Sequence, residues 1–176
     1  NKKAKISTQE GQMAFKIISD SSCDLDMRTI EELDIEVLKI KSTDQDGEDL
    51  PEEMTNKEIY QEMRDGKFFK TSQITYYEYL QKFEDLASKG ISFICITLSS
   101  GLSGTFQNAC MAKKEIEEKY PVKIEVIDSL AASVGFGQIT YFAGLAAKNG
   151  ASFEEVVSLV KFLVKNTKHI LTDFDL

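Results

Sequence analysis

The sequence predicts an α/β fold in which a parallel sheet is flanked by helices. Four short apolar runs are typical of strands: Phe15 to Ser19, Ile35 to Ile40, Ile91 to Leu98 and Val122 to Ile127. The third run is almost continuously apolar, as expected for a strand covered on both faces. Helical stretches alternate with these runs, and this alternation favours a parallel sheet between helices.

Three of the helices carry start signals of the capping-box type. In this motif a hydroxyl and a carboxylate three residues later satisfy free amide protons reciprocally. The pairs are Thr55 with Glu58, Thr75 with Glu78, and Ser152 with Glu155. After two of these starts, apolar residues recur at helical spacing, and we interpret both stripes as core. Their members are Tyr76, Tyr79, Leu80, Phe83 and Leu86 in one, and Val156, Val160, Leu163 and Val164 in the other.

The two ends of the sequence differ from its middle. Residues 1–12 are polar and without periodicity, so we expect a disordered leader or an expression remnant, a native start near Met13 and a folded domain over 13–176. The run from His169 to Leu171 predicts the start of another strand shortly before the last residue, Leu176. An element cut near its start favours a fragment of a longer protein.

Charge and hydropathy exclude several classes of function. The 176 residues include 21 Lys and Arg against 29 Asp and Glu, a net charge of −8. Nucleic acids and anionic membrane surfaces attract basic proteins, so neither is an expected partner. No stretch approaches 18 consecutive apolar residues, and the N-terminus lacks an apolar signal core. We therefore expect a cytoplasmic protein without membrane insertion.

Metal and cofactor signatures are also missing from the sequence. The three cysteines have no C-x-x-C spacing, and His169 is the single histidine. There is no G-x-x-x-x-G-K-[ST] loop, and the pair Gly135 and Gly137 lacks the third glycine of a dinucleotide-binding motif. We expect no cofactor, no metal site and no disulfide framework.

Polar segments follow three of the predicted strands, and a fourth precedes a helix. They are Asp20 to Leu25, Thr71 to Gln73, Ser99 to Thr105, and Asp128 with Ser129 running on to Gly137. Ligands of open parallel sheets bind beyond the carboxyl ends of the strands, so the three segments that follow strands should converge on one edge. At Asp20 and Asp128, acid–base roles are possible, but carboxylates that accept amide hydrogen bonds from the following turn are the commoner outcome.

The loop from Ser99 to Thr105 is the richest of these segments. It enters a helix, whose first amides are free and carry a partial positive charge, and its glycines let a ligand approach the backbone. The loop is thus suited to hold a carboxylate or a phosphate. The alternative is that Ser103 or Thr105 only caps the helix. At Thr71 a ligand contact and an ordinary turn are both open.

One alternative function is that of an acyl hydrolase with Ser103 as the nucleophile, but the sequence lacks part of the catalytic residue set that such an enzyme needs. The loop approaches the G-x-S-x-G motif, but Thr105 stands where the second glycine is required. His169 is a poor activating base because it begins a separate predicted strand.

Taken in order, four motifs resemble those of the DegV family of bacterial fatty-acid-binding proteins. They are Ile18 to Leu25, Lys70 to Gln73, Ser99 to Ala109, and Val126 to Ser129. The L-S-G-T stretch at Leu102 to Thr105 is the most specific of them. Family members often have proline and serine after T-S-Q, where this sequence has Ile74 and Thr75, a change that keeps the cap hydroxyl.

The resemblance implies a two-lobed α/β protein that holds one long-chain fatty acid, this sequence being the N-terminal lobe. It implies that Thr71 and Ser103 bind the carboxylate. The supporting residues in the same loops are Ser72, Gly104, Thr105 and Ser129. It further implies a carrier without catalytic residues, which in some members presents the acid to a separate fatty-acid kinase. A lipid-free interaction module is, with the acyl hydrolase, the remaining alternative.

Overall fold

The computed structural model describes residues 15–51 and 54–170, so the predicted leader lies outside the described residues. The strands are β1 (Phe15–Asp20), β2 (Ile35–Leu38), β3 (Ser42–Thr43), β4 (Lys70–Thr71), β5 (Ser92–Thr97) and β6 (Ile124–Asp128). The helices are η1, a short 3-10 helix (Ser21–Cys23), α1 (Met27–Glu32), α2 (Asn56–Arg64), α3 (Tyr76–Ala87), α4 (Thr105–Lys119), α5 (Ser133–Lys148) and α6 (Phe153–Asn166).

Four strands form a parallel sheet in the order β2-β1-β5-β6. Each of them begins and ends within two residues of its predicted bounds. In the register of the sheet, Ile17 of β1 lies between Ile35 of β2 and Ile94 of β5. The predicted α/β class is confirmed.

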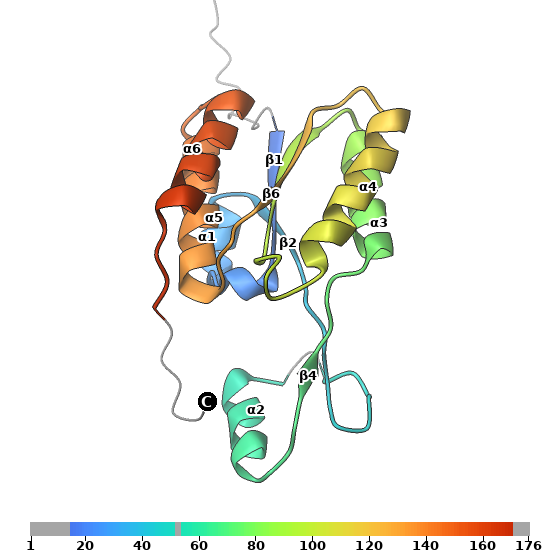
Figure 1. Cartoon of the computed structure of the whole chain (residues 1–176), viewed down its shortest axis with the longest axis vertical. Helices are drawn as coiled ribbons and strands as arrows, with labels where there is room; N and C mark the ends of the chain where they lie inside the picture. The colour runs from blue at the N-terminus through green and yellow to red at the C-terminus, as the bar shows by residue number, and fades with distance from the viewer. Residues whose placement is uncertain (1–14, 52–53, 171–176) are drawn as a thin grey trace, which may run out of the picture.

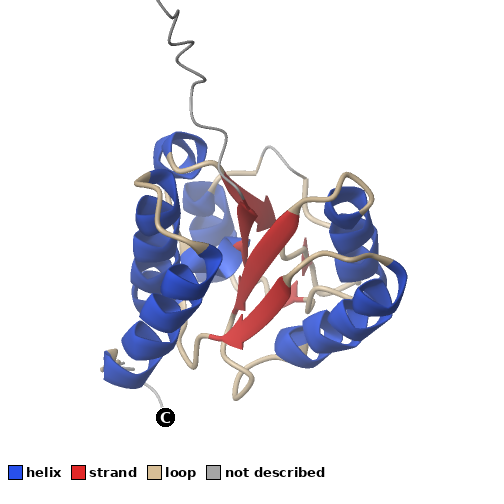
Figure 2. Ribbon diagram, turned by 90° about the horizontal axis from the view of Figure 1, so that it is seen from above, coloured by secondary structure: helices blue, strands red, loops and turns tan. Residues whose placement is uncertain are grey.

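Helices cover both faces of this sheet (Figure 2). On one face, α3 and α4 pack against side chains such as Phe93 and Cys95 of β5. On the other face, α5 and α6 pack against Ile94 and Ile96 of the same strand, with partly buried Ile30 of α1 beside them. Side chains of β5 are therefore buried on both sides, which explains its unbroken apolar run.

The predicted helix starts and core stripes are confirmed. All three capping boxes form, with the hydroxyl and the carboxylate each accepting its amide. Tyr79 and Phe83 of α3 and Val156 and Val160 of α6 are completely buried. The periodicity of these residues thus identified the buried faces correctly.

A small unit, of which the sequence predicted only the start of α2, lies beyond one end of the main sheet (Figure 1). It consists of α2 and a two-stranded antiparallel sheet in which Ser42 of β3 lies opposite Thr71 of β4. Strands of two residues are too short to show periodicity in a sequence.

The strand predicted to begin at His169 is not observed. His169 and Ile170 have no regular structure, and Leu171 lies outside the described residues. Ile170 is 91% exposed, and a strand forms only where a neighbouring backbone can pair with it. Within the described parts of the chain, no helix has both the length and the apolar character needed to cross a membrane.

The topology itself indicates where a ligand binds. From β1 the chain moves outward to β2 through α1 on one face, and from β5 it moves the other way to β6 through α4 on the opposite face. The direction of winding thus reverses between β1 and β5. In open α/β sheets, the crevice at the carboxyl ends of such a strand pair is the usual ligand site.

Candidate functional site

The segments that follow β1, β5 and β6 meet at one edge of the sheet, as predicted. The Asp20 carboxylate accepts a hydrogen bond from the amide of Leu98 at 2.9 Å. The Asp128 carboxylate accepts one from the amide of Ser100 at 3.1 Å and one from that of Leu130 at 3.0 Å. Both aspartates therefore join the loop after β5 to its neighbours.

Asp20 is completely buried. Besides the Leu98 amide, its carboxylate accepts the amide of Ser22 at 3.0 Å and the Ser22 hydroxyl. Burial raises the pKa of Asp20 above its ordinary value, although these three hydrogen bonds favour the charged form. The residue thus carries a desolvation cost that its hydrogen bonds offset only in part.

Thr71 and Ser103 line one cavity of about 390 Å³ at this edge. The complete lining is Ile40, Thr71, Ser72, Gln73, Leu98, Leu102, Ser103 and Gly104. Two of the residues expected to support the site, Ser72 and Gly104, are among them. The structure thus brings the T-S-Q and L-S-G-T segments together around a common space.

Thr71 lies in β4 and not in a turn, so the turn alternative is wrong. The next residue, Ser72, donates both its amide, at 2.9 Å, and its hydroxyl, at 3.3 Å, to the carbonyl of Lys41. The Asn108 side chain of α4 donates to the carbonyl of Ile74 at 2.8 Å. The segment that carries Thr71 is thereby held against both the small unit and α4.

Ser103 directly precedes Gly104, the N-cap residue of α4, and bonds to the first residue of that helix. Its hydroxyl oxygen accepts the amide of Thr105, the first residue of α4, at 3.3 Å and lies 2.8 Å from the Thr105 hydroxyl. A hydroxyl has one hydrogen and two acceptor positions. When Thr105 donates to Ser103, the Ser103 hydrogen is free to point to an anion in the cavity.

Gly104 lies directly beneath the side chain of Gln73. A β-carbon at this position would lie 2.2 Å from the side-chain oxygen of Gln73. Without it, the Gln73 side chain lies over the start of α4. The T-S-Q and L-S-G-T segments thus touch each other at Gln73 and Gly104.

The other two supporting residues act beneath the surface of the site. Thr105 is completely buried, and its hydroxyl lies 2.8 Å from that of Ser103, which lines the cavity. The buried Ser129 hydroxyl donates to the carbonyl of Ala131 and accepts its amide, both at 3.1 Å. Ser129 therefore shapes the neighbouring loop and is not among the lining residues.

Apolar lining residues were missed by sequence analysis. Ile40, Leu98 and Leu102 line the cavity, and Ile40 is shared with an adjoining cavity of about 450 Å³. The adjoining cavity is also lined by Leu50, Pro51 and Ile59, which belong to or border the small unit. The only signal for Ile40 and Leu98 was their place at the ends of predicted strands, and nothing in the sequence indicated that the small unit folds beside them.

Among the described residues, His169 is not placed as a base for Ser103. The ring of His169 lies over α5, with its Cε1 atom 1.8 Å from where a β-carbon of Gly135 would be. The side-chain partner of the Ser103 hydroxyl is Thr105. The requirement of a nucleophile–histidine pair is therefore not met within the described residues.

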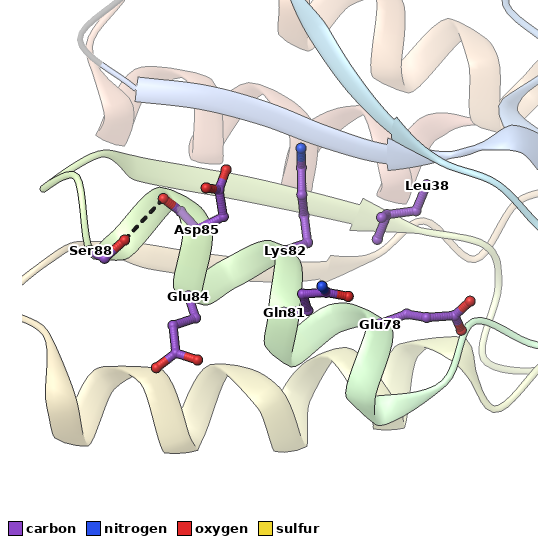
Figure 3. Close-up of a pocket in the computed structure, with 7 residues that line it drawn as sticks. All are labelled: Leu38, Glu78, Gln81, Lys82, Glu84, Asp85 and Ser88. Carbon is purple, nitrogen blue, oxygen red and sulfur yellow. Dashed lines mark hydrogen bonds between the residues drawn. The ribbon is translucent and has the colours of Figure 1, made fainter.

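A larger cavity of about 540 Å³ is lined by Leu38 of β2 and by residues of α3 and its C-terminal end (Figure 3). Its lining is mostly charged or polar, and the side chains point in several directions from the helix. Lys82 pairs with Glu36 at 2.8 Å, and Asp85 pairs with Lys89 at 2.7 Å. These are the features of a solvated helix face, so we place the site at the sheet edge.

Comparison with known proteins identifies the family. The family model described as an uncharacterised protein of the DegV family matches residues 14–176. A DegV domain-containing protein of Clostridium perfringens is 34% identical over 151 residues, which are 84% of this chain and 52% of the relative. The chain thus spans about half the length of the curated relatives that it matches.

Two solved structures with the fold of this chain are 31% and 27% identical to it in sequence. A stearic acid-binding protein from Eubacterium ventriosum has a TM-score of 0.75 at 31% identity, over 84% of this chain and 52% of that one. A DegV family protein from Thermus thermophilus, described by its fatty acid binding, has a TM-score of 0.75 at 27% identity, over 86% and 53%. On this evidence the chain belongs to the DegV family.

Proposed function

We propose that this chain binds a long-chain fatty acid by its carboxylate and acts as a carrier without catalysing a reaction. The observation that carries the proposal is the common cavity of Thr71 and Ser103 at the start of α4. The fatty acids bound by the similar solved proteins support the same class of ligand.

Neutral donors allow an acidic protein to hold an anion. The hydroxyls of Thr71 and Ser103 each supply a hydrogen bond to a carboxylate, worth about 1.5–3 kcal/mol when charge-assisted. The partial positive charge of the helix start adds to them. These contacts mainly offset the desolvation of the carboxylate, so they determine the orientation of the ligand more than its affinity.

The acyl chain supplies most of the affinity. About fourteen methylenes at roughly 0.8 kcal/mol each give on the order of 11 kcal/mol before the costs of association. Leu98 and Leu102 border the polar end of the site, and the adjoining cavity offers Ile40, Leu50 and Ile59. Polar donors next to apolar surface suit a molecule with one charged end.

We further propose that the bound acid is presented to a fatty-acid kinase. Such a partner has to reach the carboxylate, and the head-group end of the cavity lies at an open surface, where Thr71 is exposed and Leu102 is 67% exposed. Adding a bacterial fatty-acid kinase and ATP to the loaded protein should yield an acyl phosphate. Unchanged fatty acid with every such kinase tried would contradict this part of the proposal.

The carboxylate assignment is tested by the double variant Thr71→Ala/Ser103→Ala. Two lost charge-assisted hydrogen bonds of about 1.5 kcal/mol each correspond to a roughly 100-fold weaker affinity for palmitic acid. The measurements are titration with the acid and mass spectrometry of copurified lipid. The matched control is Ser88→Ala/Ser158→Ala, which removes two hydroxyls that bond only to backbone carbonyls of α3 and α6.

The control should bind like the parent. Equal lipid occupancy in the double variant and the parent would refute the two assignments. An organic extract of the parent without any lipid, together with no binding in titration, would favour the lipid-free interaction module. Covalent labelling of Ser103 by an organophosphonate would favour the acyl hydrolase.

A further inference from the structure

We propose that Asp20 and Ser21 are positioning residues for the carboxylate site, each fixing one of its two walls. The inference rests on the proposed function, because it concerns the same cavity. Neither of these two neighbouring side chains lines the 390 Å³ cavity, although Ser21 lines the adjoining cavity of about 450 Å³. They act on it through backbone amides of residues that do.

Asp20 fixes the wall that carries Ser103. One carboxylate oxygen accepts the amide of Leu98, a lining residue, at 2.9 Å, while the other is held by Ser22. Directly after Leu98, the carbonyl of Ser99 accepts the amide of Ser103 at 3.2 Å. A displacement of Leu98 is therefore passed to Ser103 through one residue and one hydrogen bond.

Ser21 fixes the wall that carries Thr71. Its hydroxyl oxygen accepts the amide of Ile40, also a lining residue, at 2.9 Å. The carbonyl of the following residue, Lys41, accepts the amide of Ser72 at 2.9 Å. Ser21 thus stands in the same relation to Ser72, the neighbour of Thr71, as Asp20 does to Ser103.

Side chains are needed here because the sheet ends before these positions. β2 stops at Leu38 and β5 at Thr97, so Ile40 and Leu98 lie just outside the strand ladders. A carboxylate can accept on both oxygens, whereas an asparagine offers one acceptor and one donor. Burying the Asp20 carboxylate also costs desolvation free energy. A binding site whose two walls must hold fixed positions relative to each other accounts for that cost.

The test compares palmitic acid with methyl palmitate, which has the same chain but no charge. We expect the parent to bind the acid more tightly, and Asp20→Asn or Ser21→Ala to reduce the acid-to-ester affinity ratio about 10-fold while ester affinity changes less than about 3-fold. Ser21→Thr, which keeps the acceptor, should restore the ratio. A merely structural role would weaken both ligands alike.

Hydrogen exchange locates the effect of each variant. Asp20→Asn should lower protection of the Leu98 amide, and Ser21→Ala that of the Ile40 amide. The matched controls are Asp26→Asn, which alters a carboxylate that accepts the amide of Thr29, and Ser92→Ala, which removes a hydroxyl that accepts the amide of Lys123. Both should leave the ratio unchanged.

The outcomes separate the two proposals. A parent that binds neither ligand contradicts the proposed function. A parent that prefers the acid, with variants that keep its ratio or lose both ligands equally, overturns the positioning role alone. If Asp20→Asn does not fold, Ser21→Ala and its rescue by Ser21→Thr decide the question.

Discussion

Apart from α1, which has the single side-chain cap of Asp26, the α-helices of this molecule show two kinds of start. The helices α2, α3 and α6 begin with complete capping boxes made by their own side chains. In contrast, α4 and α5 begin at Gly104 and Ala132 without a side-chain cap among the described residues. Both uncapped starts follow strands of the main sheet and lie at its carboxyl edge.

The helices α2, α3 and α6 are stabilised at their starts by their own side chains, whereas α4 and α5 are not. A capping carboxylate at α4 would occupy the first amides and repel an anionic ligand. The uncapped helices are held by packing and tertiary contacts instead, such as the bond from Asn108 of α4 to the carbonyl of Ile74. At the start of α4, the N-cap residue Gly104 has no side chain to cap the helix, and the Thr105 amide bonds to the Ser103 hydroxyl.

The largest effect should come from disturbing the packing that holds α5. A β-carbon at Gly137 would lie 2.3 Å from the carbonyl oxygen of Cys23, a backbone atom that cannot turn aside. We expect Gly137→Ala to lower the free energy of unfolding by about 2 kcal/mol, because the clash outweighs the gain in helix propensity. Chemical denaturation measures this.

The control for that change is Gly135→Ala in the same helix. There the obstructing atoms belong to the exposed His169 side chain, which can move. We expect this variant to be as stable as the parent or slightly more stable. Equal losses in the two variants would contradict the view that packing against the backbone of η1 holds α5.

The next effect separates a capping hydroxyl from a binding hydroxyl. Thr75→Ala removes the cap of α3 and should cost about 1 kcal/mol of stability, with no change in fatty-acid affinity. Ser103→Ala should do the reverse, with a loss of less than about 0.5 kcal/mol in stability and a roughly tenfold weaker affinity. Denaturation and titration of both variants, beside Thr75→Ser as control, provide the comparison.

If Ser103→Ala is destabilising to the same degree as Thr75→Ala and binds normally, Ser103 is a cap and the contrast between the two kinds of helix start fails.

The comparison can also be sharpened by adding a side-chain cap to α5. Ala132 has the extended backbone of an N-cap residue, with φ −140° and ψ 162°.

At Ala132, threonine and valine have the same shape and differ in one hydroxyl. We expect Ala132→Thr to be more stable than Ala132→Val by about 0.5–1 kcal/mol, because the hydroxyl accepts a free amide of α5. Thermal unfolding of the two variants measures the difference. Equal stability would mean that the start of α5 is already satisfied by other contacts.

The finest distinction is between two carboxylates whose pKa values move in opposite directions. The pKa of Glu155 is lowered, first by the backbone hydrogen bond at Ser152. Its contribution to stability is therefore present above the pKa of the unfolded state and is lost as pH falls through the folded pKa. Burial raises the pKa of Asp20, so its contribution is present below the unfolded pKa and is lost as pH rises through the folded pKa.

Carbon-detected NMR titration of the side-chain carboxyls tests both directions. Ser152→Ala should raise the pKa of Glu155, and Ser22→Ala should raise that of Asp20 further by removing a hydrogen bond that lowers it. A fall in either value would contradict the assigned causes.

The sequence by itself determined the elements whose causes are local or periodic. The strands of the main sheet, the three capping boxes and the stripes of α3 and α6 follow from hydrophobic spacing and from partners three residues apart. It also placed Asp20, Ser100 and Asp128 at one edge, because the carboxyl ends of parallel strands meet there.

Only the tertiary structure decided how the cavity is enclosed. Its walls come from Ile40, Thr71 and Leu98, which are distant in sequence and are joined by Asp20 and Ser21 through backbone amides. The two-residue strands β3 and β4 pair because the rest of the fold holds them together. They are too short to show a hydrophobic periodicity in the sequence. Contacts between remote segments depend on the folded arrangement of the chain, so a linear pattern contains the residues of the site but not its shape.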